Sequence, residues 1–161
     1  MRAWDDRSPE AAALLNPALM AVITANAAWQ YERASGQPMP WPLAFLVAPL
    51  ILHKGTRESL PRTTRTHLST WIGDHPVIRA GFPERARSLT GHVREGLRFG
   101  MAHGALLVTD HGALYGRLPN TAKPVQGGDA AHIVQSAGKV GTWFSRAEQP
   151  ATLFALFGVA P

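Results

Sequence analysis

The sequence predicts a mainly α-helical fold with one small two-stranded β-hairpin, and three patterns predict it. Apolar residues recur at spacings of three and four from Pro83 to His103, which is typical of an amphipathic helix. A strand-turn-strand pattern follows directly at residues 105–118. Further helical patterns occupy residues 17–33, 42–52 and 129–159. A chain of 161 residues with these elements is expected to fold as a single domain, residues 1–161.

Residues 8–53 are expected to form a helical hairpin. Ser8 suits the N-cap of a first helix, and Pro9 suits its first helical position. Asn16-Pro17 should end that helix, because proline lacks a backbone donor and biases the preceding residue away from helical geometry. A second helix should then run from Pro17 to Arg33.

The segment 42–52 carries no charged residue and predicts a buried helix, with the surface beginning at the polar residues that follow. Pro49 should kink this helix or divide it into two short pieces. At 1.5 Å per residue the segment is about 16 Å long, well short of the ~30 Å hydrocarbon core of a bilayer. The N-terminal residues also lack an apolar signal core. We therefore expect a cytoplasmic protein.

Residues 62–118 follow the order of a winged helix-turn-helix unit, in which two helices precede a hairpin. A short helix is predicted from Thr63 to Gly73, and the Pro83–His103 helix comes next. In a winged helix, the helix before the hairpin enters the major groove of DNA, although many such modules bind protein instead. An ordinary helix followed by a hairpin has the same order. Both interpretations stay open.

Residues 129–159 predict C-terminal helices. Asp129 suits a helix N-terminus, and the apolar face of that helix would consist of Ile133, Val134, Ala137, Val140 and Phe144. Pro150 should separate it from a very apolar tail, residues 151–159. An apolar tail at this size suggests surface that a partner covers, and Phe154 and Phe157 are the candidate docking residues.

The positive charge is concentrated in one part of the chain. The whole chain has a formal net charge of +5, and residues 54–98 alone contain nine basic and four acidic side chains. Such a segment suits an acidic partner, but charge does not separate DNA from an acidic protein. The candidate partner- or DNA-binding residues are Lys54, Arg57, Arg62, Arg65, Arg87, Arg94, Arg98 and, on the second strand of the hairpin, Arg117.

The sequence contains no recognisable catalytic or metal-binding motif. There are no cysteines, which excludes disulfides and thiolate metal sites. The seven histidines show no metal-ligand spacing, and Asp74-His75 and Asp110-His111 both fall in predicted turns. Nucleophile-elbow and nucleotide-binding glycine patterns are missing from the sequence. We therefore predict a protein that is not an enzyme, with no cofactor and no metal.

Segments spread over nearly the whole chain resemble one family, the middle components of bacterial three-component ABC ATPase systems. The similar segments are Trp4-x-x-Arg7-x-x-Glu10, Leu15-Asn16-Pro17-Ala18, the run from Leu46 to Lys54, Arg57-Glu58, Leu60-Pro61, and the closing Leu156 to Pro161. The same group includes the Lamassu anti-phage systems, which combine an SMC/Rad50-like ATPase with an effector such as a nuclease.

The resemblance implies a non-catalytic accessory subunit that bridges the ATPase and a nuclease-type effector in an anti-phage defence complex. Its expected partners are those two components, with double-stranded DNA as a further candidate. The alternative is a free-standing winged-helix transcriptional regulator. Such a regulator would be stable by itself, whereas a bridging subunit should depend on its ATPase.

Overall fold

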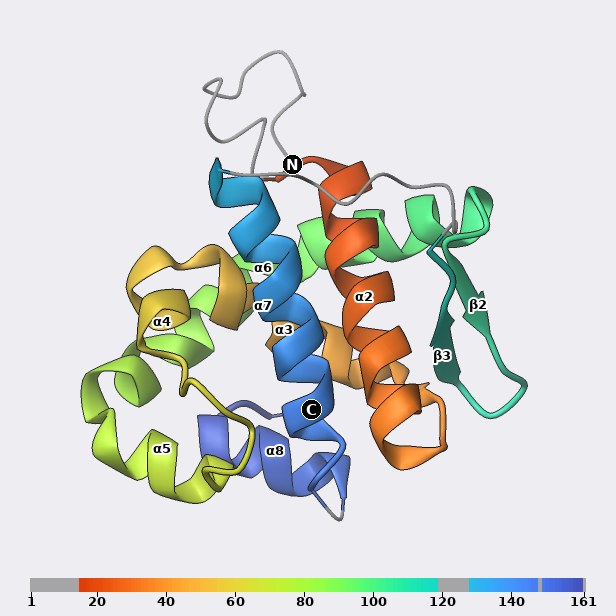
Figure 1. The fold of residues 1–161 in the computed structure, drawn as a ribbon. Helices are drawn as coiled ribbons and strands as arrows, with labels where there is room; N and C mark the ends of the chain where they lie inside the picture. Colours follow the sequence, from red (N-terminus) through yellow and green to blue (C-terminus); the bar gives the residue numbers. More distant parts are fainter. Residues whose placement is uncertain (1–14, 119–127, 148, 161) are drawn as a thin grey trace.

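The computed structural model describes residues 15–118, 128–147 and 149–160 (Figure 1). The first helix expected from the sequence, which begins at Ser8, lies outside these residues. The helices are α2 (Pro17–Ser35), the short 3₁₀ turn η2 (Trp41–Leu43), α3 (Ala44–Leu52), α4 (Lys54–Ser59), α5 (Leu68–Asp74), α6 (Pro76–Ala102), α7 (Gly128–Phe144) and α8 (Pro150–Phe157). The strands are β1 (Met39–Pro40), β2 (Leu106–Val108) and β3 (Ala113–Gly116). The mainly α-helical class predicted from the sequence is confirmed.

Helix α2 lies at the centre of the fold and packs against α7, α6, α3 and β3 (Figure 1). The side chain of Asn16 caps its start by accepting a hydrogen bond from the backbone N–H of Ala18 at 2.8 Å. Gly36 ends it with a φ of 73°, a left-handed conformation that glycine adopts without strain. The helix therefore runs two residues past the expected end at Arg33. Because its neighbours lie on several sides, it is buried around most of its circumference.

Small residues allow those neighbours to approach α2 closely. A Cβ added at Gly141 of α7 would collide with the carbonyl oxygen of Ala27, and one added at Gly116 of β3 would collide with that of Ala25. Gly96 of α6 lies against Met20 in the same way. The side chain of Asn26 also donates a hydrogen bond to the Val134 carbonyl of α7 at 2.7 Å.

Helix α3 is the buried helix that the uncharged segment predicts, and seven of its nine residues are buried. Pro49 lies inside the helix without dividing it, so the expected division into two pieces is wrong. The helix is short and enclosed by α2, α6 and α7, and this packing compensates for the hydrogen bond that proline removes.

Helix α6 begins at Pro76, seven residues before the Pro83 start that the sequence predicts. Pro83 lies inside the helix, and the preceding Phe82 is fully buried. The Phe82 ring stacks on Phe157 of α8 with 4.4 Å between ring centroids, so tertiary packing holds the first turns in helical form. Helix α5 starts at Leu68 rather than at Thr63, so it is shorter than expected.

The predicted hairpin is present as β2 and β3, but it belongs to a three-stranded antiparallel sheet with the order β1-β3-β2. The sequence does not predict the third strand, Met39–Pro40, because it has only two residues. One of them is proline, which strands tolerate only at an edge. The sequence order of a winged helix is thus observed in α5, α6, β2 and β3, while β3 packs on α2. The winged-helix interpretation itself stays a prediction.

Helix α8 covers the lower end of the molecule in Figure 1. Phe154 is 5% exposed and Phe157 is 0% exposed, so both fill the chain's own core. This placement corrects the expectation of an apolar tail that awaits a partner: α8 folds back on α5 and α6 and covers its own apolar side. Within the described residues, no helix is long and apolar enough to cross a membrane.

Candidate basic partner-binding surface

Two buried tryptophans form hydrogen bonds that hold the segment between α4 and α5 in place. The Trp71 indole N–H donates to the carbonyl of Ser59 at 3.0 Å, and the Trp143 indole N–H donates to the carbonyl of Thr66 at 2.7 Å. The two rings meet edge to face with 5.4 Å between centroids, and each residue is 3% exposed. The segment 60–67 is therefore held at both ends although it has no regular structure.

Exposed arginines of the segment 60–67 lie next to basic residues on α7 and just after it. Arg62 and Arg65 are exposed on the segment, and Lys139 and Arg146 are exposed on α7 and just after it. We call these four residues the basic face. Helix α7 supplies Lys139 and also Trp143, whose indole binds the segment, and Arg146 follows two residues after the helix ends.

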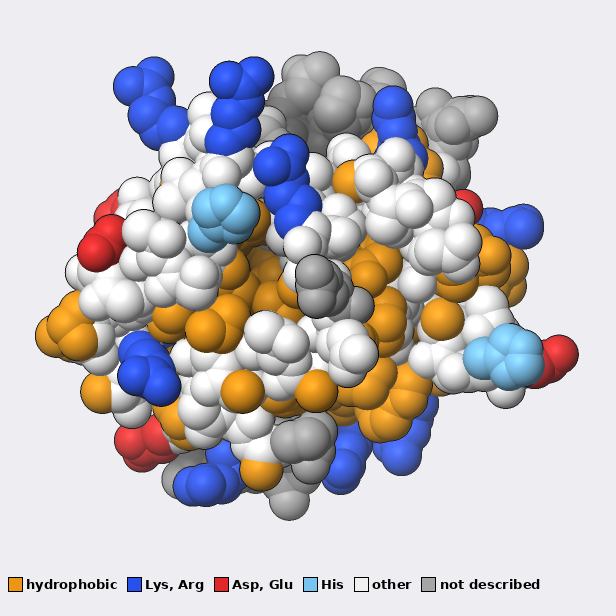
Figure 2. All heavy atoms as spheres, turned by 90° about the horizontal axis from the view of Figure 1, so that it is seen from below, with side chains coloured by type: hydrophobic (Ala, Val, Ile, Leu, Met, Phe, Trp, Pro, Cys, Tyr) orange, Lys and Arg blue, Asp and Glu red, His pale blue; other side chains and the backbone are white. Residues whose placement is uncertain are grey.

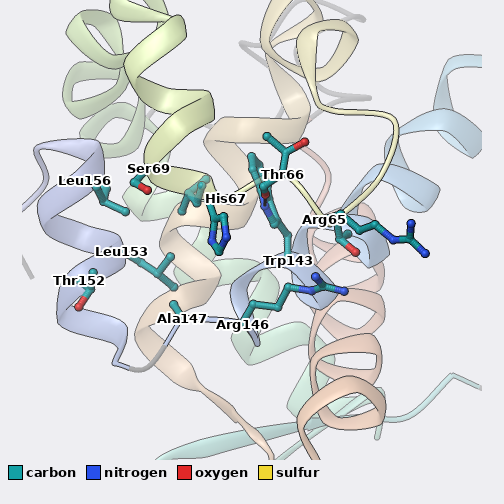
Figure 3. Close-up of a pocket in the computed structure, with 12 residues that line it drawn as sticks. Arg65, Thr66, His67, Ser69, Trp143, Arg146, Ala147, Thr152, Leu153 and Leu156 are labelled. Carbon is teal, nitrogen blue, oxygen red and sulfur yellow. Dashed lines mark hydrogen bonds between the residues drawn. The ribbon is translucent and has the colours of Figure 1, made fainter.

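Two hollows adjoin the basic face. One has a volume of about 390 Å³ and an apolar floor that includes Leu153 and Leu156 of α8. Figure 3 shows the His67 ring within this pocket and the guanidinium ends of Arg65 and Arg146 together on one side of it. The other hollow, of about 540 Å³, has Arg62 and Lys139 among its lining residues. Among the described residues that line them, neither hollow has a carboxylate.

The underside of the molecule combines apolar area with peripheral charge. Seen from below, the molecule shows hydrophobic side chains across the middle of this face and Lys or Arg side chains toward its margins (Figure 2). Such a surface attracts phosphates or carboxylates through its cations and can cover apolar groups of a partner. It therefore suits a binding function.

Burial shifts the pKa of two described side chains. Burial raises the pKa of the Tyr31 hydroxyl and lowers the pKa of the Arg85 guanidinium. Neither side chain lines either hollow. Among the described residues, no group of three or more His, Asp or Glu side chains is placed to hold a metal ion.

Arg57, which the sequence suggests as a partner contact, lies inside the protein and is 3% exposed. Its guanidinium donates to the carbonyl of Ile51 at 2.6 Å and pairs with Asp129 at the start of α7. Helix α4 begins immediately after α3, and the groups that hold the guanidinium come from the end of α3 and the start of α7. In this structure the Arg57 side chain connects α4 to α3 and α7 and is not exposed for contact with a partner. Lys54 is exposed and pairs with Glu58 at 3.8 Å.

The remaining candidates lie on other parts of the surface. Arg87, Arg94 and Arg98 are exposed on α6, and Arg117 is exposed just after β3. The structure thus brings Arg62 and Arg65 together and places the α6 arginines on a separate helix. Sequence reasoning missed Lys139 and Arg146, because they lie in a nearly neutral part of the sequence and reach the basic face only through the fold.

Comparison with known proteins confirms the resemblance found in the sequence at the level of the middle component. The family model described as ABC-three component (ABC-3C) system Middle Component 3 matches residues 4–161. A search of curated proteins found no match. A search of solved structures also found none. Because the family model covers nearly the whole sequence, the chain belongs to the family of ABC-three component system middle components 3.

Proposed function

We propose that this middle component is a non-catalytic bridging subunit that links the ABC ATPase of its system to the effector. One observation carries the proposal: the family match extends over residues 4–161, so the entire fold corresponds to a middle component. A middle component implies an ABC ATPase and a further component as partners. We further propose that the ATPase is of the SMC/Rad50-like type, that the effector is a nuclease, and that the system is a Lamassu-type defence against phage.

The structure supports a bridging function by offering separate surfaces on one compact body. The basic face lies around α7 and the segment 60–67, whereas Arg87 and Arg94 lie beside a groove between α6 and α8. A subunit that joins two partners needs two such surfaces. Duplex DNA is a further proposed ligand of the basic face, because its four cations can neutralise phosphates.

The test is reconstitution of the three components encoded together. Tagged ATPase is purified from cells that express it with the effector, once with this chain and once without it, and each preparation is treated with nuclease. We expect the effector to co-purify with the ATPase only when this chain is present, and the complex to survive nuclease. Equal recovery of the effector without this chain would contradict bridging. In a second purification this chain carries the tag, and recovery of DNA without the ATPase would instead favour a free-standing regulator.

A further inference from the structure

A groove with an apolar floor runs between η2, α3, α6 and the residues after α8. It has a volume of about 720 Å³. Its apolar lining includes Trp41, Phe45, Ala86, Phe154 and Val159. We call it the aromatic groove.

Trp41 is exposed in this groove yet held in one position. The residue is 47% exposed, which is unusual for so large an apolar side chain. Its ring meets Phe45 edge to face with 5.7 Å between centroids, and its backbone N–H donates to the carbonyl of Gly112 at 3.2 Å. A Cβ added at Gly112 would lie 3.1 Å from the indole, so the hairpin turn packs directly against the ring. A fixed, exposed tryptophan is typical of residues that dominate binding interfaces.

Two arginines of α6 form a positively charged wall of the same groove. Arg87 and Arg94 both line it and both are exposed. They are seven residues apart, which is about 10.5 Å along a helix at 1.5 Å per residue. Within the described part of the chain, neither has an ion-pair or hydrogen-bond partner. The described residues that line the groove include no carboxylate.

We infer that the aromatic groove binds an apolar segment of a partner component that carries Asp or Glu residues beside its apolar side chains. The apolar side chains of that segment cover the floor around Trp41, and its carboxylates pair with Arg87 and Arg94. Two carboxylates spaced by about 10 Å match the two guanidiniums, which corresponds to residues seven apart on one face of a helix. This inference rests on the proposed function, since the partner is one of the two components that the chain bridges.

The floor of the groove favours a protein segment over DNA. Phosphates of a duplex would pair with the two arginines but would leave the apolar floor without a matching surface. The floor includes aromatic rings from η2, α3 and α8, whereas phosphate-binding surfaces are mainly polar and basic. A peptide segment with apolar and acidic side chains can cover the apolar floor and pair with the two arginines.

The first experiment identifies the occupant by photocrosslinking in the complex of this chain with the co-expressed ATPase and effector. p-Benzoylphenylalanine replaces Thr90, which lines the groove but is neither the tryptophan nor an arginine of it. Mass spectrometry of the crosslinked peptide should locate an apolar segment with Asp or Glu residues in one of the two components. A crosslink to a second copy of this chain, to DNA, or to a segment without carboxylates would overturn the inference.

The second experiment measures affinity for the component that crosslinks, using matched charge reversals on α6. We expect Arg87→Glu combined with Arg94→Glu, and separately Trp41→Ala, to weaken binding by about tenfold or more. Arg98→Glu is the control, because Arg98 is exposed on the same helix and does not line the groove. It should change the affinity by less than about twofold. Circular dichroism melting of each variant shows that it is folded.

A charge swap completes the test. Changing the acidic residues of the crosslinked segment to Arg should restore binding to the Arg87→Glu, Arg94→Glu variant. If wild-type chain binds a component and the groove variants bind it equally well, the inference is wrong while the bridging function stands. If wild-type chain binds neither component, the proposed function fails, and the inference fails with it.

Discussion

At the scale of single residues, Arg57 and Asp129 form an asymmetric pair. The Arg57 side chain is 1% exposed, whereas the Asp129 side chain is 60% exposed. Water can solvate the carboxylate when its partner is removed, but it reaches the guanidinium poorly. Removing the carboxylate should therefore lower the free energy of unfolding more than removing the guanidinium.

We predict that Asp129→Ala lowers the free energy of unfolding by about 3 kcal/mol, because it leaves a buried cation without its counter-charge. Arg57→Met should cost less, about 1–2 kcal/mol, since it leaves a solvated carboxylate and one carbonyl, that of Ile51, without its donor. Urea denaturation measures both. Lys54→Ala, which removes only an exposed pair, is the control and should cost under about 0.5 kcal/mol. A larger loss for Arg57→Met than for Asp129→Ala would show that burial of the cation is not the dominant effect.

Glycines at close approaches provide a second residue-level prediction. Gly116→Ala should lower the free energy of unfolding by about 2 kcal/mol or more, because its Cβ would collide with the Ala25 carbonyl of α2. Gly73→Ala is the matched control, since a Cβ there meets nothing within 4 Å and the residue lies in helix α5. It should stabilise by up to about 1 kcal/mol. Thermal melting of the two variants distinguishes them, and two losses of similar size would contradict the close-packing argument.

At the scale of elements, α8 depends on the aromatic rings it shares with its neighbours. Phe157 stacks on Phe82 of α6 at 4.4 Å and meets Phe144 of α7 edge to face at 6.3 Å, measured between ring centroids. This cluster joins α6 to α7 and α8, the two helices that end the chain. Helix α8 therefore belongs to the core of the domain, and it also supplies Phe154 to the aromatic groove.

Phe157→Ala should lower the free energy of unfolding by about 3–5 kcal/mol, the usual cost of a large cavity in a packed core. Ala155→Ser on the exposed side of the same helix is the control, with an expected loss under about 1 kcal/mol from helix propensity. Guanidinium denaturation gives both values. Unchanged stability together with lost partner binding would restore Phe157 as a docking residue and contradict its core function.

At the scale of the whole molecule, exposed cations line two separate places, the basic face and the wall of the aromatic groove. If the basic face binds duplex DNA, Arg62→Ala combined with Arg65→Ala should weaken binding and reduce the slope of log affinity against log salt by about two. The comparison variant, Arg87→Ala with Arg94→Ala, removes the same charge from the groove and should leave the DNA slope unchanged. Fluorescence anisotropy over a salt series measures this. Equal effects of both pairs would mean that the affinity for DNA depends on the net charge of the protein and not on the basic face.

The helices α2 and α7 and the β2–β3 hairpin were predictable because the features that specify them are local. A cap at Asn16, an apolar repeat from Ile133 to Phe144, and a glycine turn at Gly112 each act within a few residues. Arg62 and Arg65 of the basic face were predictable for the same reason, since a cluster of charges on a polar segment is visible in sequence. The family was also recognisable from segments of the sequence alone and is confirmed by the family match.

Only the tertiary structure decided which charges and rings face outward. Arg57 and Phe157 look like surface and tail residues in the sequence, but helices from other parts of the chain cover them. Trp41 directly precedes the apolar segment 42–52 and is nevertheless exposed at the surface, where the hairpin turn and Phe45 contact it. Lys139 and Arg146 lie near Arg62 and Arg65 because the Trp143 indole hydrogen-bonds the segment 60–67 to α7. The amino-acid sequence determines local elements through short-range propensities, whereas burial depends on contacts between distant residues and exists only once those elements have packed together.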